Sequence, residues 1–495
     1  MRLVLAAKSA RDSTDLGSTS ERLINLYPVP NAEGGRAQFK LRAVPGAEDF
    51  TSLPFGFSRA WGVVEGVLYI VQGGALWKVS ETGITTNVAA VSDDVETTIS
   101  GNRDNVIVSA AGSYNVWDGA ALTQPGSGRI ASISSAAFLD QFTLMAQRGG
   151  REIEWTEVGV PGNRNALYFR TAEARDDRVM RIIDNGGYLY ALKETNTEVW
   201  GSTARGGAGA FSRVQGPVIE TGLLGFNLVT RTPVGLFIVG HDRTAKLISG
   251  QVAQPLSTPP IDQALRDGDP THCFYYEDRG QRFAVIRFSD RPAWVCDLSL
   301  GMWHERSLGV DHDAWDVIGA EFAYGRWHLI GRTGRIFRLG EKPIDASGPM
   351  RRTAVSREVY FGGPRRRIDL LELLGNFGAS GLTEVAPNWL TDEYGDPILS
   401  EDGSPILLPD TQETEMIARP ARIWVRLSGD GGATFGRARI KDIPNRYDAT
   451  CRWRALGMFR RMVVEISRTD EKSISEAIPI AAMDAALRML KIWSR

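Results

Sequence analysis

The sequence predicts an all-β protein: a six- or seven-bladed β-propeller followed by a small β-sandwich-like domain with an inserted hairpin arm. Three observations lead to this fold: a hairpin that recurs at a near-constant interval, a turn-rich composition, and a change of strand pattern beyond residue 340. In each recurring unit, a short apolar strand is followed by a polar or Gly-rich turn and a second strand with a bulky side chain. Such units are typical of radially arranged sheets.

The interval between hairpins is close to the length of one propeller blade. The bulky side chains that mark the seven units are Trp77, Trp117, Trp155, Trp200, Leu247, Trp294 and Phe337. Successive markers are 40, 38, 45, 47, 47 and 43 residues apart, and a four-stranded blade takes roughly 40 to 50 residues. An ordinary β-sandwich also contains hairpins at loosely regular spacing. The narrow spread of the intervals favours the propeller.

Composition and charge exclude several classes of protein. The 495 residues include 53 Gly, 23 Pro and 13 Trp and are 43% hydrophobic, which indicates a globular chain of two or three domains with many turns. The 57 Lys and Arg against 59 Asp and Glu argue against a dedicated nucleic-acid binder. No stretch approaches the roughly 20 apolar residues of a membrane span, and Met1 to Lys8 is too short for a signal peptide. The chain is expected to be made in the cytosol.

The domains are predicted to follow one another in chain order. Residues 1–55 form an extended leader that lies on the propeller or donates a strand to close its ring, and residues 56–342 form the propeller. Segments 343–383 and 415–479 contain strands without the blade period and are predicted to form the C-terminal β domain. Residues 480–495 form a tail.

Two details of the C-terminal region carry separate predictions. In the tail, Ile480, Met483, Leu487 and Leu490 follow helical spacing, which predicts a short helix.

Residues 384–414 contain a tandem eight-residue unit and are predicted to form a projecting hairpin arm. The apolar residues of the arm are Trp389, Ile398, Leu399, Ile406, Leu407 and Leu408. An isolated hairpin cannot bury so many apolar side chains, so we expect the arm to dock on a partner.

A short motif in the C-terminal domain matches the Asp box of sialidases. The motif runs from Ser428 through Asp430, Gly432 and Thr434 to Phe435, with Phe where the pattern has Trp. Its carboxylate can accept backbone N–H groups across a β-turn, and its glycines permit positive φ. A single copy outside the blade region indicates a structural turn rather than a sugar site.

No other residue pattern predicts catalysis, a cofactor or a metal. His304 and His312 are eight residues apart, which is not a recognised ligand spacing, and the three cysteines lack the spacing of a zinc site or a disulfide framework. A basic cluster is formed by Arg365, Arg366 and Arg367. It is interpreted either as a contact with acidic patches of neighbouring subunits or the adaptor, or as a solvated face paired with carboxylates of its own domain.

Several segments resemble one known family. They are Ile24 to Val29, Val44 to Gly46, Ser58 to Gly62 and Leu68 to Val79 near the beginning, and Arg452 to Gly457 with Phe459 to Arg461 near the end. Together these segments resemble the opening and closing strands of the tail hub, or packaged-DNA stabilisation, proteins of short-tailed bacteriophages. The resemblance extends to both ends and the propeller between them, and the family has no catalytic residues to carry over.

The resemblance implies a structural virion protein that is assembled in the host cytoplasm. It implies a ring, expected to be a homohexamer, that lies below the portal and its adaptor, retains the packaged genome and is the nozzle for ejection of double-stranded DNA. Other tail components, such as a fibre, spike or needle, are the further partners expected. Two alternatives from other classes remain open: a propeller glycosidase or sialidase, which needs a carboxylate pair or an Arg cluster at the propeller mouth, and a glycan-binding adhesin.

Overall fold

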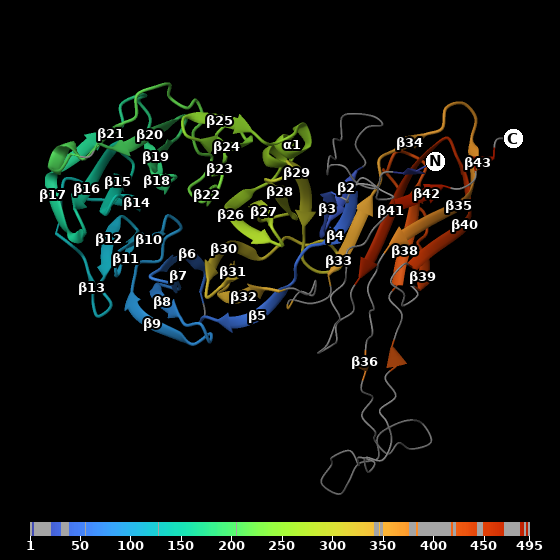
Figure 1. Ribbon diagram of the computed structural model, residues 1–495, viewed down its shortest axis with the longest axis horizontal. Coiled ribbons are helices and arrows are strands. Elements are labelled where there is room, and N and C mark those ends of the chain that lie inside the picture. The colour runs from blue at the N-terminus through green and yellow to red at the C-terminus, as the bar shows by residue number, and fades with distance from the viewer. Residues whose placement is uncertain are drawn as a thin grey trace, which may run out of the picture.

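The computed structural model consists of a ring of small antiparallel sheets beside a two-sheet sandwich (Figure 1). The structure describes residues 2–3, 21–30, 39–54, 56–126, 128–203, 205–340, 346, 350–375, 383–384, 417–418, 422–442, 449–469, 486–489 and 492–493. The arm residues Trp389, Ile398, Leu399, Ile406, Leu407 and Leu408 lie outside these ranges.

Within the described ranges, five four-stranded blades follow one another along the chain. The first three are β6 (Ser58–Val64), β7 (Val67–Gln72), β8 (Ala75–Val79) and β9 (Thr85–Ala90); β10 (Thr98–Asn102), β11 (Asn105–Ala110), β12 (Ser113–Trp117) and β13 (Leu122–Thr123); and β14 (Ile133–Leu139), β15 (Phe142–Gln147), β16 (Glu152–Glu157) and β17 (Val160–Thr171). The next two are β18 (Val179–Asn185), β19 (Tyr188–Lys193), β20 (Thr197–Ser202) and β21 (Phe211–Arg213); and β22 (Val229–Thr232), β23 (Gly235–Val239), β24 (Ala245–Ser249) and β25 (Val252–Pro255).

The first blade shows why the recurring hairpin forms. Gly73 and Gly74 join β7 to β8 and have φ values of 57° and 78°, which suit the two central positions of a type I′ hairpin turn. In β7, Leu68 and Val71 are fully buried although they point to opposite faces, because blades pack on both sides. The apolar clusters accordingly lie between neighbouring blades.

The ring is closed by a blade that combines distant parts of the chain. It contains β30 (Val317–Ala323), β31 (Arg326–Gly331), β32 (Arg335–Leu339) and, from the leader, β5 (Ala47–Ser52). Strand β5 pairs antiparallel with β32. The leader therefore donates the outer strand of the last blade and joins the two ends of the propeller.

A further set of four strands occupies the remaining place in the ring. These strands are β26 (Pro270–Asp278), β27 (Gln281–Phe288), β28 (Ala293–Asp297) and β29 (Met302–Arg306). Strand β26 contacts β22 on one side and β30 on the other. In the described chain the propeller thus has seven blades, of which six are separate sheets and one belongs to a larger sheet.

That larger sheet continues from the propeller into the C-terminal domain. Its order is β26-β27-β28-β29-β2-β33-β41-β38-β39, with β34 paired to β41. The added strands are β2 (Arg22–Ile24), β33 (Arg351–Val355), β34 (Val359–Tyr360), β38 (Arg422–Ser428), β39 (Arg439–Asp442) and β41 (Arg461–Thr469). Strand β2 pairs in parallel with β29 and antiparallel with β33. Part of the leader is therefore built into the C-terminal domain as well as into the propeller.

A second sheet completes the sandwich. It contains β1 (Arg2–Leu3), β35 (Arg366–Gly375), β40 (Ala449–Phe459), β42 (Ala486–Met489) and β43 (Ile492–Trp493). Side chains from both sheets, including Leu371 and Trp453 from the second and Val425 and Val464 from the first, form one buried core. Strands β3 (Leu26–Pro30) and β4 (Phe39–Ala43) form a hairpin beside it.

The remaining elements lie at the ends of blades and at the base of the arm. Helix α1 (Pro259–Asp267) buries Ile261 and Leu265 against the propeller, and η1 (Gly207–Gly209) is a single 3₁₀ turn before β21. Strands β36 (Thr383–Glu384) and β37 (Ile417–Ala418) pair antiparallel. The two chain segments that flank the arm therefore run side by side at its base.

The prediction of a helix in the tail is wrong for the part of the tail that the structure describes. Ala486–Met489 is strand β42, and it pairs with β35 in the second sheet of the sandwich. Helical spacing of four apolar residues is a weak local signal. The edge of β35 offers unpaired backbone groups that a strand satisfies and a helix does not.

Candidate functional site

A surface depression on the sandwich combines arginines with exposed apolar side chains. Tyr360, Arg365, Met458, Phe459 and Arg460 line it, and we call this group the arginine–aromatic surface. Tyr360 and Met458 are 61% and 55% exposed, which is high for large apolar side chains. Arginine and aromatic residues are enriched at the centres of protein–protein interfaces.

Tight turns place these residues together. Gly362 and Gly363 have φ values of 63° and 72° in the connection between β34 and β35, which brings Arg365 to the start of β35. The hairpin between β40 and β41 carries Phe459 and Arg460. The Phe361 N–H donates to the Arg460 carbonyl at 3.0 Å and ties the two turns together.

The predicted basic cluster is only partly brought together. Arg365 and Arg367 are exposed, whereas Arg366 is half-buried. Arg367 pairs with Asp369 of its own strand at 2.7 Å, and Arg461 lies 3.6 Å from Glu358. Within the described ranges, Arg365 and Arg460 have no such carboxylate. They are the cations of this surface that remain available to a partner.

The Asp-box motif forms the connection between β38 and β39. The Thr434 N–H donates to the Asp430 carboxylate at 3.0 and 3.1 Å, and the Ser428 hydroxyl donates to the same carboxylate at 2.5 Å. The Gly432 N–H donates to the Ser428 hydroxyl, and Phe435 packs against the Arg426 guanidinium. Hydrogen bonds from the Ser428 and Thr434 side chains hold the pKa of Asp430 well below its usual range. The hydrogen bonds to the Asp430 carboxylate therefore come from residues of its own turn.

The junction between propeller and sandwich is held by polar side chains as well as by sheet pairing. Arg22 of β2 donates to both carboxylate oxygens of Glu305 in β29, at 2.6 and 2.5 Å. Asn25 is fully buried, and its side-chain amide donates to the Ser307 hydroxyl and the Arg351 carbonyl, each at 2.9 Å. These bonds connect blade, leader and sandwich.

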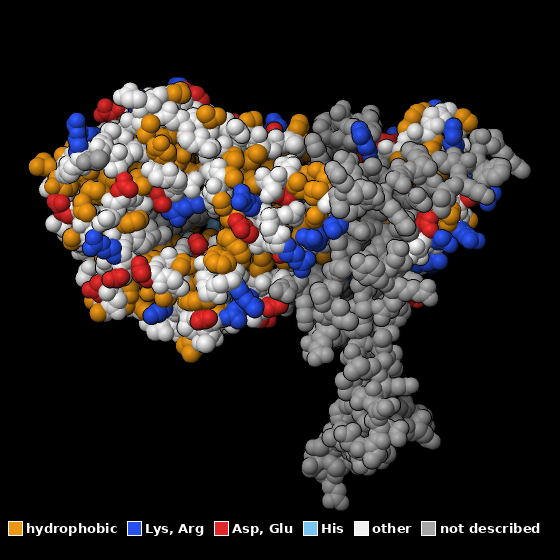
Figure 2. Space-filling model, in the orientation of Figure 1, with side chains coloured by type: hydrophobic (Ala, Val, Ile, Leu, Met, Phe, Trp, Pro, Cys, Tyr) orange, Lys and Arg blue, Asp and Glu red, His pale blue; other side chains and the backbone are white. Residues whose placement is uncertain are grey.

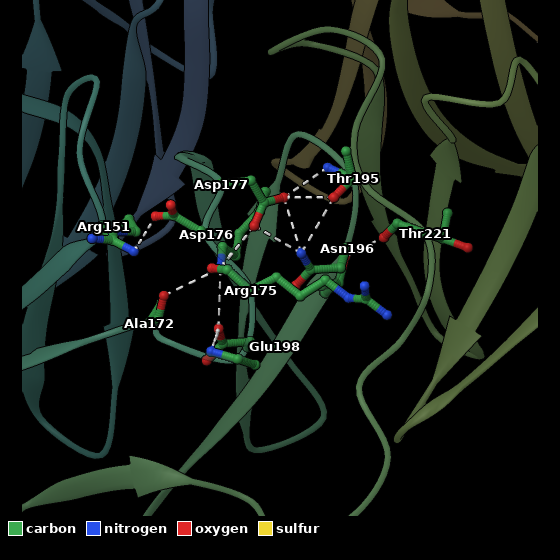
Figure 3. Close-up of polar contacts among 12 residues, drawn as sticks. Arg151, Ala172, Arg175, Asp176, Asp177, Thr195, Asn196, Glu198 and Thr221 are labelled. Carbon is green, nitrogen blue, oxygen red and sulfur yellow. Dashed lines mark hydrogen bonds and ion pairs between the residues drawn. The ribbon is translucent and has the colours of Figure 1, made fainter.

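A buried lysine cluster fixes the crossing from the third to the fourth blade (Figure 3). Lys193 is fully buried and lies 2.8 Å from Asp177 and 3.3 Å from Glu198. Its ammonium also donates to the carbonyls of Ala172 and Arg175. Burial alone would raise the pKa of Asp177, but hydrogen bonds from Lys193 and neighbouring groups lower it overall. The Lys193 ammonium is surrounded by internal partners, although one buried oxygen of Glu198 has none among the described residues. The role of the cluster is therefore structural.

The axis of the propeller contains a cavity of about 220 Å³. Its lining includes the ionisable residues Arg59 from β6, Arg181 from β18, Arg231 from β22, His272 from β26 and Glu321 from β30. Figure 2 shows the corresponding hollow in the propeller face, with basic and acidic side chains around it. No sequence pattern predicted a functional site at any of these five residues.

The described residues form neither a metal-binding cluster nor a membrane-spanning helix. In these ranges, no group of three or more His, Cys, Asp and Glu could hold a metal ion. His304 and His312 have separate surroundings: His304 is buried against the rings of Tyr27 and Phe283, whereas His312 contacts the hydroxyls of Ser307 and Thr353. Among the described elements, no helix has the length and apolarity required to cross a bilayer.

Fold and surfaces together define a structural β-propeller protein with an appended sandwich. The chain belongs to the family described as bacteriophage P22 Gp10, beta-propeller, whose model matches residues 2–339. It is therefore a bacteriophage structural protein, and the family resemblance expected from the sequence is confirmed. No curated protein sequence matches the chain.

Solved structures with a similar fold are distant. The designed protein Ika8 is 12% identical, with 59% of this chain and 99% of that chain covered and a TM-score of 0.40. The Pan2 WD40 domain of Neurospora crassa is 10% identical, covering 60% and 97%, with a TM-score of 0.41. BamB from Moraxella catarrhalis is 14% identical, covering 66% and 98%, with a TM-score of 0.39. These values are too low to support any statement about function.

Proposed function

We propose that the chain is the subunit of a tail nozzle. In this proposal, identical subunits form a closed ring, a homohexamer, below the portal and its adaptor. The ring retains the packaged genome and is the conduit for ejection of double-stranded DNA. Assembly takes place in the host cytoplasm, and the protein then belongs to the virion tail. Membership of the bacteriophage P22 Gp10 family supports this role, which needs no catalytic residue and no cofactor.

The observation that carries the proposal is the sheet shared by the propeller and the sandwich. Strands β26 to β29 of one blade continue through β2 into β33, β41 and β38, and the half-buried Arg22–Glu305 contact lies on this path. The two parts are therefore joined by hydrogen-bonded strands of a single sheet. A subunit that does not bend between its domains is suited to the wall of a tube, because neighbouring subunits then meet at fixed angles.

The arginine–aromatic surface is the proposed contact with a neighbouring subunit or with the adaptor. It combines the exposed side chains of Tyr360 and Met458 with Arg365 and Arg460, for which the described chain provides no carboxylate partner. An acidic and partly apolar surface on the partner would complement it. Burial of the two apolar side chains contributes about 25 cal/mol per Å² of apolar area removed from water.

The near balance of charges is consistent with passage of DNA rather than with tight binding. The chain has 57 basic and 59 acidic residues. Each phosphate that a protein neutralises releases counterions and adds affinity, so a strongly basic wall would retain the genome during ejection.

A knockout and complementation experiment tests this role. Phage that carry a stop codon in this gene should still package DNA into heads in a non-permissive host, but the particles should lose their DNA. Supplying the wild-type protein in trans should restore filled, infectious particles, whereas a double substitution of Arg365 and Arg460 by Glu should restore fewer. Stable, filled and infectious virions without the protein would refute the nozzle role.

A further inference from the structure

The axial cavity of the propeller concentrates cations that its own carboxylates do not balance. Arg59, Arg181 and Arg231 reach it from three different blades. Arg59 pairs with Asp93 at 2.5 Å, and Arg231 pairs with Asp184. Neither of these two carboxylates lines the cavity. Arg181 forms no ion pair within the described ranges.

The surroundings of Arg181 leave part of its guanidinium without a hydrogen-bond acceptor. One terminal nitrogen donates to the Phe226 carbonyl at 3.0 Å, and the guanidinium lies 5.0 Å from the Phe226 ring. The Nε–H is buried and has no partner in the described structure. Burial and the nearby charge of Arg231 lower the pKa of Arg181 to about 10. Arg181 nevertheless remains a cation at neutral pH, and an unpaired buried cation is costly.

The protonation states of His272 and Glu321 contribute to the net charge of the cavity lining. His272 lies beside the ring of Trp61, and burial together with nearby arginines, including Arg181 and Arg59, lowers its pKa to about 3. It is therefore a neutral imidazole, and its buried Nδ1 has no partner among the described residues. Glu321 is the carboxylate of the lining, and burial raises its pKa to about 7. Near neutral pH it is only partly ionised and does not fully balance Arg181, the arginine of the lining without an ion pair in the described structure.

We propose that the axial cavity binds a small tetrahedral oxyanion of the sulfate or phosphate class, held by Arg181 and Arg231. The anion would supply the counter-charge that Arg181 lacks within the described structure and would offset the repulsion between the two guanidiniums. Because Arg181 belongs to β18 and Arg231 to β22, the anion would link two neighbouring blades at the axis.

The size of the cavity distinguishes a free ion from the phosphates of DNA. A volume of about 220 Å³ accommodates a tetrahedral oxyanion with several waters, but it does not admit a double helix. The proposed ligand is therefore the free ion, and the site is independent of the proposed nozzle role.

Thermal unfolding of the full-length protein, measured with sodium sulfate and with sodium chloride at equal ionic strength, tests the proposal. Sulfate should raise the melting temperature of the wild type more than chloride does. Sulfate also stabilises proteins without binding to a site, so the informative quantity is the difference between variants. Arg181→Met should lose the extra rise. Arg129→Gln, which removes an exposed arginine paired with Glu152, should keep it.

Isothermal titration with sulfate supplies a direct measurement. The wild type should bind one ion per chain, and Arg181→Lys, which keeps the charge but replaces the planar guanidinium by a single ammonium group, should bind about tenfold more weakly. This milder variant covers the case in which Arg181→Met does not fold. Short duplex DNA should not compete. The proposal is overturned if the wild type shows no saturable binding, if both Arg181 variants bind like the wild type, or if duplex DNA displaces the ion.

Discussion

Two cations in the interior of the propeller have opposite surroundings. Lys193 is fully buried and contacts two carboxylates and two backbone carbonyls. Arg181 faces the axial cavity, repelled by Arg231 and with one N–H unsatisfied. The first arrangement stabilises the crossing between blades. The second leaves an electrostatic cost that a bound anion can reduce.

Replacing Lys193 by Met should destabilise the propeller by about 3 to 5 kcal/mol, because Asp177 and Glu198 would remain buried without their cation. Lys246→Met is a suitable control, since Lys246 pairs with Asp242, whose side chain is 39% exposed. That change should cost about 1 kcal/mol or less. Urea unfolding monitored by Trp fluorescence measures both effects. Equal losses from the two substitutions would refute the structural role of the buried lysine.

Glu321 should make stability depend on pH. Burial raises its pKa to about 7 from an ordinary value of 4.5, so the folded protein holds this proton to a higher pH than the unfolded chain does. Its contribution to stability is therefore favourable at low pH and is lost as the pH rises through about 7. Charged groups facing the same cavity are Arg59, Arg181 and Arg231, while His272 is neutral.

The Glu321→Gln variant tests this dependence. It should match the wild type in urea midpoint near pH 5 and exceed it near pH 8, because glutamine remains uncharged at both values. Glu152→Gln, which removes the carboxylate that pairs with exposed Arg129, is the control. Its difference in urea midpoint from the wild type should not increase between pH 5 and pH 8. A constant difference between Glu321→Gln and the wild type at all pH values would mean that Glu321 does not titrate in this range.

At the scale of single elements, turns and strand edges determine which predictions hold. The blade hairpins were recognisable because apolar strands and Gly-rich turns such as Gly73–Gly74 recur at one interval. Strand β2 could not be recognised from the sequence, because its three residues pair with Thr353 to Val355 and with Glu305, which are distant from it in the chain. The predicted tail helix failed for the same reason: an available edge of β35 decided the structure of Ala486–Met489.

The candidate sites could be predicted from the sequence less well than the fold could. Arg365 was noticed as part of a basic run, but Tyr360 and Met458 become neighbours of it only through the turns that end β34 and β40. The residues of the axial cavity come from different blades, so no local motif connects them. A usable signal would have been ionisable residues in the first strand of several repeats.

The Asp430 turn provides a test at this scale. Asp430→Ala should lower the melting temperature of the sandwich, because Thr434 and Ser428 lose the acceptor of their hydrogen bonds. The hydrogen-bonded carboxylate has a lowered pKa, so its contribution is present above the unfolded pKa and is lost as the pH falls through the folded one. Asp442→Ala, at an exposed ion pair with Arg422, should have little effect. Glycosidase activity in the wild type that Asp430→Ala abolishes without a change in melting temperature would contradict the structural assignment.

At the scale of the whole molecule, the propeller and the sandwich form one unit with two proposed regions of contact with other tail proteins or subunits. The shared sheet connects them, the arginine–aromatic surface faces outward from the sandwich, and the described segments Thr383–Glu384 and Ile417–Ala418, which flank the arm in the sequence, pair as β36 and β37. We propose that the arm grips an adjacent subunit or another tail component through its apolar residues.

Deletion of the arm separates assembly from folding. Because Thr383–Glu384 and Ile417–Ala418 run antiparallel, a short Gly-Ser bridge can replace residues 385–413. The shortened protein should unfold at the same temperature as the wild type, whereas tails built from it should dissociate or the heads should leak DNA. As a control, a variant that keeps the arm length but replaces the tandem turns by Gly-Ser should assemble. Stable, DNA-retaining virions from the deletion variant would show that the arm is not an assembly clamp.

The most direct test of the central claim is the symmetry and position of this chain in the intact virion. Cryo-electron microscopy of whole particles, reconstructed around the tail axis without imposed symmetry, should show a closed ring of identical subunits on the DNA path, with each propeller and sandwich in one fixed orientation. A heterologous interface that closes is what a tube requires. A single copy, a two-fold dimer, or a position away from the DNA path would contradict the account.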